Sequence, residues 1–78
     1  MTEIDKLRAL LPHWIEHNDE HAAEFERWAE TAASAGQGKA AEYIHSAAQQ
    51  MARSNLTLQQ ALDELGGPVS LEGHPHTH

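Results

Sequence analysis

The chain has 78 residues and no cysteine, which leaves room for one small domain and excludes a disulfide framework, a cysteine-based zinc site and a thiol catalyst. Five basic against twelve acidic residues give a formal net charge of −7, so we expect no nucleic-acid partner. The sequence contains no run of about 18 apolar residues and no signal-peptide pattern. We therefore expect no membrane partner and a cytoplasmic location.

A short helix is predicted at the start of the chain. Thr2 followed by Asp5 resembles a capping box, and apolar residues then recur at helical spacing, which predicts a helix over residues 3–10. Pro12 cannot donate a backbone hydrogen bond to the preceding turn, and it disfavours helical geometry in the residue before it. We therefore place a break at Leu11.

Two long helices are expected to follow. Residues 12–35 are rich in Ala and Glu and end at a glycine-containing turn over residues 36–38. Residues 39–65 carry apolar side chains at i, i+3, i+4 and i+7 spacing, and the segment Gly66–Pro68 stops this helix. The link between the two helices is short, so they must run antiparallel.

These elements predict an all-α fold. Residues 1–67 should form an antiparallel helical hairpin with a short N-terminal helix, and residues 68–78 a flexible tail that contains histidine. A chain of this length rarely builds a large core alone, and its apolar stripe is larger than one hairpin can cover. We therefore expect a homodimer that forms a four-helix bundle.

Histidine is the most unusual feature of the composition, with seven residues in 78. His13, His17 and His21 lie at i, i+4 and i+8, which places them along one side of the main helix. The apolar stripe of this helix, centred on Trp14, includes His17, Asn18 and His21 within about 60°. The stripe is therefore expected to have a polar middle.

The last helix repeats this pattern, because Asn55 lies at the centre of its apolar stripe. Antiparallel pairing of the two long helices places Asn18 opposite Asn55. One interpretation is a buried hydrogen-bonded layer that sets the register of the helices. In this interpretation the histidines only form hydrogen bonds within the layer.

The other interpretation is a metal site. His17 and His21 would bind a divalent ion, with Glu20 and Glu24 as further ligands or as acceptors for the imidazole N–H groups. Histidine and carboxylate ligands suit zinc, nickel or cobalt. His13 is predicted to lie at the edge of the stripe and is a weaker candidate. Three further histidines alternate with Pro and Thr in the tail, a composition typical of metal-capturing tracts: His74, His76 and His78.

The stretch His13–Phe25, together with Asn55 and the segment 61–67, resembles small uncharacterised helical-hairpin proteins linked to nickel or cobalt handling. The resemblance implies a metal-linked accessory role. Its marked positions are His17, Asn18, His21 and Asn55.

Two functions follow from these patterns. The first is a non-enzymatic binder that stores, buffers or delivers nickel, cobalt or zinc, with a metal-receiving protein as a partner. The second is a structural or protein-interaction module whose His and Asn layer sets register and dimer pairing. No phosphate-binding loop or nucleophile motif supports an enzyme.

Overall fold

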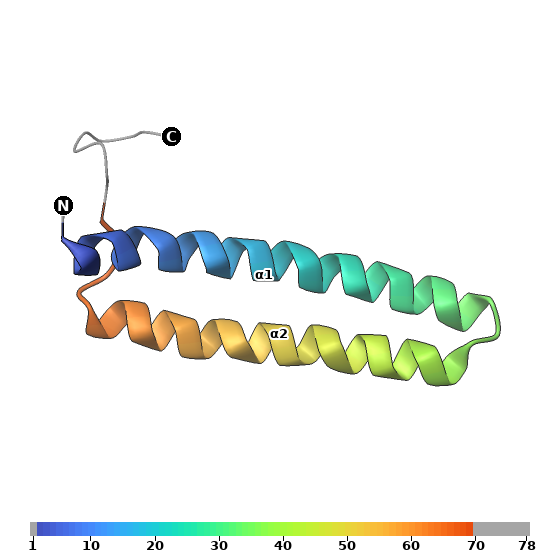
Figure 1. Cartoon of the computed structure of the whole chain (residues 1–78). Helices are drawn as coiled ribbons and strands as arrows, with labels where there is room; N and C mark the ends of the chain where they lie inside the picture. The colour runs from blue at the N-terminus through green and yellow to red at the C-terminus, as the bar shows by residue number, and fades with distance from the viewer. Residues whose placement is uncertain (1, 70–78) are drawn as a thin grey trace.

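A computed structural model describes residues 2–69 of the chain. Helix α1 spans Glu3–Ser34 and helix α2 spans Gly38–Glu64. The two helices lie side by side and run antiparallel along an elongated molecule (Figure 1). The all-α hairpin is therefore confirmed, and α2 agrees with its predicted bounds to within one residue. Within the described residues, neither helix combines the length and the apolar character needed to cross a membrane.

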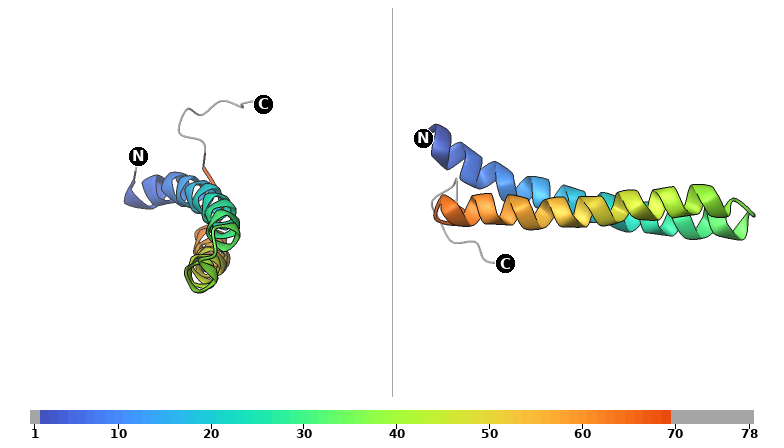
Figure 2. Two further views of the ribbon diagram at one scale, coloured as in Figure 1. Left: turned by 90° about the vertical axis from the view of Figure 1, so that its right-hand side faces the viewer. Right: turned by 90° about the horizontal axis from the view of Figure 1, so that it is seen from below.

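Helix α1 passes through Pro12 without a break. The predicted separate helix over residues 3–10 and the predicted break at Leu11 are therefore wrong. Proline removes one hydrogen bond and bends a helix, and Figure 2 shows the first turns of α1 inclined to the rest of the helix. Leu11 is only 3% exposed, so its burial against α2 stabilises the continuous helix at this point.

Capping residues explain where α1 begins and where both helices end. The hydroxyl of Thr2 accepts a hydrogen bond of 3.0 Å from the backbone N–H of Asp5, as the capping pattern predicts. Gly36 and Gly66 lie two residues beyond the ends of α1 and α2, with φ of +85° and +101°. These are left-handed conformations that glycine adopts without steric cost, and they reverse the chain in the same way at both helix ends.

The helices pack through one seam whose residues alternate at spacings of three and four, as in a coiled coil. Small side chains such as Ala29 and Ala48 are buried there and allow the helices to approach closely. The seam residues are Leu11, Ile15, Asn18, Ala22, Phe25, Ala29 and Ala32 in α1, and Ala41, Ile44, Ala48, Met51, Asn55, Leu58, Leu62 and Leu65 in α2.

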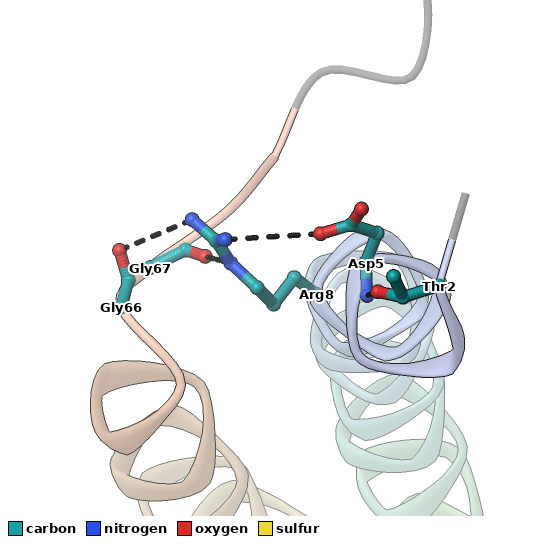
Figure 3. Close-up of polar contacts among 5 residues, drawn as sticks. All are labelled: Thr2, Asp5, Arg8, Gly66 and Gly67. Atoms are coloured by element: carbon teal, nitrogen blue, oxygen red, sulfur yellow. Dashed lines mark hydrogen bonds and ion pairs between the residues drawn. The ribbon is translucent and has the colours of Figure 1, made fainter.

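Arg8 connects the start of α1 to the end of α2 (Figure 3). Its Nε donates a hydrogen bond of 2.7 Å to the carbonyl of Gly67, and its Nη2 donates one of 3.4 Å to the carbonyl of Gly66. Asp5 lies 4.0 Å away on the other side of the guanidinium. A positive charge at this helix end is favourable, because the unpaired carbonyls there carry partial negative charge. Sequence reasoning missed this contact.

Candidate functional site

A polar layer lies in the middle of the seam. Asn55 is 8% exposed, and its Nδ2 donates hydrogen bonds to the carbonyl of Ile15 at 3.0 Å and to Oδ1 of Asp19 at 2.7 Å. Its Oδ1 accepts a hydrogen bond of 3.0 Å from Nδ2 of Asn18. The predicted opposition of Asn18 and Asn55 is therefore confirmed. Within residues 2–69, no buried polar side-chain atom lacks a partner.

The histidines of α1 form a row along one side of the helix, as predicted. The ring centroids of His13 and His17 are 4.4 Å apart, and those of His17 and His21 are 6.1 Å apart. All three residues are exposed in the single chain, with the His21 side chain at 53%. The prediction that His17 and His21 share the buried stripe with Asn18 is therefore wrong.

The reason for this error is a rotation of the seam on α1. The prediction centred the buried stripe on tryptophan, but Trp14 and Trp28 are 41% and 60% exposed. The seam instead passes through the residues that follow them, Ile15 and Ala29. Because alanine lets the two helices come closer than an indole would, close packing selects the small residue for the seam.

The predicted carboxylate ligands also lie on the outside of α1. Oε1 of Glu24 lies 3.8 Å from Nδ1 of His21, and Glu20 is exposed. Among the described residues of one chain, no three His, Asp or Glu side chains group closely enough to hold a metal ion. Three other predicted ligands lie outside the described residues: His74, His76 and His78.

A second contact between the helices lies on one flank of the seam. Nδ1 of His45 is 2.6 Å from Oε1 of Glu26. Each of these residues directly follows a seam residue, so the positions after the seam share one side of the hairpin. The positions before the seam therefore share the opposite side, as in other antiparallel coiled coils. Sequence reasoning missed this pair, although the antiparallel register could have indicated it.

The side formed by the positions before the seam has an unusual composition. It holds four of the six large apolar residues that the described part exposes. Its α1 half carries large side chains and its α2 half mostly small ones. We name it the aromatic side. Its residues are Leu7, Leu10, Trp14, His17, His21, Glu24, Trp28 and Thr31 of α1, with Ala40, Tyr43, Ala47, Gln50, Ser54, Thr57, Ala61 and Glu64 of α2.

Comparison with known proteins gives one match. Residues 7–65 match the domain of unknown function DUF8180. The chain belongs to the DUF8180 family. The matched residues include all of α2 and α1 from Leu7 onward, with the Asn layer and the histidine row, so the DUF8180 domain covers most of the hairpin. No curated protein and no solved structure matches the chain. The family description carries no function, so the link to nickel or cobalt stays a prediction.

Proposed function

We propose that this DUF8180 hairpin is a protein-interaction module that associates with a second copy through its aromatic side to form a four-helix bundle. The observation that carries the proposal is the exposure of Leu10, Trp14 and Trp28 on one side of the molecule. Exposed apolar side chains that gather on one side of a molecule often mark a protein-interaction site. Aromatic residues are also enriched among the side chains that dominate interface energetics.

The small core of the single hairpin supports this proposal. Among residues 2–69, five are buried, and two of them are alanine, which removes little apolar area from water. Chains of this size usually gain stability from a metal, a disulfide or a second chain. A disulfide is excluded because the chain has no cysteine.

The distribution of charge favours a second copy as the occupant of the aromatic side. The chain carries a formal net charge of −7, so two copies repel each other unless their acidic residues stay apart. The aromatic side carries two acidic residues, Glu24 and Glu64, and no charged residue between Leu7 and His21. Asp19 and Glu26 lie on the opposite side. Contact through the aromatic side therefore brings the least negative charge together.

Light scattering on the full chain tests the proposal, with a dimer expected in place of the 8.6 kDa chain. Trp28→Glu should weaken the dimer about 30-fold, the effect of losing an interface residue worth about 2 kcal/mol. Leu56→Glu is the matched control, because Leu56 is similarly exposed but lies on the opposite side. A wild-type chain that stays monomeric at high micromolar concentration contradicts the proposal.

A second candidate function is binding of zinc, nickel or cobalt, for storage, buffering or delivery to a receiving protein. The row of histidine rings favours it, because histidines at i and i+4 on a helix can bind the same ion. Calorimetric titration with each metal should give more heat for the wild-type chain than for a His17→Ala and His21→Ala double variant. Equal heats count against this function. A non-enzymatic role and a cytoplasmic location stay predictions.

A further inference from the structure

We propose that association of two chains completes a divalent-metal site that neither chain holds alone, with His17 and His21 of both copies as ligands. The proposal rests on the proposed dimer. It further specifies that the dimer has a two-fold axis and that its ligand is a divalent metal ion. A shared site needs only two ligands from each chain, which agrees with the absence of any group of three candidate ligands among residues 2–69.

The position of the two histidines along α1 carries the argument. Helix α1 spans Glu3–Ser34, so its midpoint lies between Asn18 and Asp19, half a residue from Asp19. When two copies of α1 pair antiparallel around a two-fold axis at the level of Asp19, residues at equal distances from Asp19 face each other. His17 and His21 flank Asp19 at two residues on either side. His17 of each copy therefore faces His21 of the other, and four imidazoles meet at the axis.

The same arrangement also brings together two large apolar residues of the aromatic side. Leu10 and Trp28 also lie at equal distances from Asp19, so Leu10 of one copy faces Trp28 of the other. Both side chains are exposed in the single hairpin, at 43% and 60%. Their mutual contact removes apolar surface from water on both flanks of the histidines and limits the access of solvent to the site.

Helix α2 fits this arrangement through its small residues. The hydrogen bond between Asn18 and Asn55 fixes the register of the hairpin, and one step along each helix places Ser54 level with Asp19. The two-fold axis therefore passes near Ser54 of both copies. Ala47 and Ala61 lie at equal distances from Ser54 and face each other across the interface. Small side chains at these positions permit close packing of the two α2 helices.

The chemistry of the four imidazoles points to a borderline divalent cation. Nitrogen ligands in a tetrahedral set suit zinc, and imidazole also binds nickel and cobalt. Oε1 of Glu24 lies 3.8 Å from Nδ1 of His21. A small rotation lets this carboxylate accept the Nδ1 proton, which leaves Nε2 of His21 for the metal. A bound cation also lowers the repulsion between two chains that each carry a formal charge of −7.

Metal titration of the full chain tests the site. The tail histidines are first replaced with glutamine so that they do not compete: His74, His76 and His78. Equilibrium dialysis with zinc should then give one ion for every two chains, and zinc should tighten the dimer. His17→Ala and His21→Ala should each weaken binding at least about tenfold, since changes even to residues that orient a ligand have effects of that size. His45→Ala is the control, because His45 lies on the opposite side of the hairpin.

The outcomes separate this inference from the proposed dimer. One ion per chain, or unchanged zinc affinity in the His17→Ala variant, overturns the shared site. A dimer that forms but takes up no zinc, nickel or cobalt also overturns the site and leaves the dimer intact. A chain that stays at 8.6 kDa with and without metal overturns both proposals.

Cysteine substitution tests the symmetry independently, because the natural chain has no cysteine. Ser54→Cys should form a disulfide-linked dimer with oxidised glutathione, since the proposed axis brings the two copies of residue 54 together. Ser46→Cys is a matched control on the outer surface of α2 and should stay uncrosslinked. If α1 of one copy packed instead against α2 of the other, the two introduced thiols of the Ser54→Cys variant would lie apart. Absence of the crosslink in this variant therefore overturns the proposed arrangement.

Discussion

Replacing Asn55 with alanine tests whether the polar layer holds the two helices together. The change removes hydrogen bonds to Asn18, to the carbonyl of Ile15 and to the carboxylate of Asp19. A neutral hydrogen bond contributes about 1 kcal/mol and one to a charged group about 2 kcal/mol. Asp19 is exposed and regains water, so we expect a total loss of about 3 kcal/mol. This is a large part of the about 5–15 kcal/mol that stabilises a typical domain.

Urea unfolding followed by far-ultraviolet circular dichroism measures this loss. Wild type and variants must be compared at one protein concentration, because association shifts the apparent stability. Asn18→Ala removes only one of the three bonds and should lower the free energy of unfolding by about 1 kcal/mol. Gln60→Ala is the control, an exposed amide on the outer surface of α2. A loss below about 0.5 kcal/mol in Asn55→Ala refutes a stabilising role for the layer, because surface changes have effects of that size.

The same urea experiment checks three further predictions. Arg8→Ala removes the hydrogen bonds at the end of α2 and should lower stability by about 1–2 kcal/mol, whereas Arg53→Ala, on the outer surface, should change it little. Gly36→Ala should lower stability by about 1 kcal/mol, since φ is +85° there; Gly38→Ala, at a helical position with open space, should not lower it. Pro12→Ala should raise stability by about 1 kcal/mol or more, because it restores a helical hydrogen bond.

The sequence predicts much of the fold because its main signals are local. Apolar periodicity and the flanking glycines define α2, and the short turn forces the antiparallel arrangement. The continuity of α1 through Pro12 could not be predicted in this way. Proline favours a break on local grounds, whereas burial of Leu11 beside it favours an unbroken helix. That burial depends on α2, which a local rule does not consider.

The sequence predicts which side of α1 carries the candidate site residues, but it does not predict whether that side is buried. Spacing alone aligns His17 and His21 on one side of α1. Whether that side is buried depends on which of two neighbouring apolar stripes packs against α2. Because tryptophan is more hydrophobic than alanine, a prediction from hydrophobicity centres the buried stripe on Trp14 and Trp28. The helices, however, approach closely only through a seam of smaller residues such as Ala29. The larger side chains are thereby left exposed on the surface of the hairpin.

The Asn layer favours the observed register of the hairpin over registers shifted by one heptad. A slip by one heptad moves the helices by about 10 Å and keeps apolar residues in the seam at most levels, so apolar contact alone discriminates poorly between registers. The slip nevertheless places Asn55 opposite Leu11 or Phe25 in place of Asn18, and it leaves the buried amide without its hydrogen bonds. An unpaired buried amide costs about 1–3 kcal/mol. Because the same register sets Ser54 level with Asp19, the Asn layer also determines which small residues of α2 accompany His17 and His21 on the aromatic side.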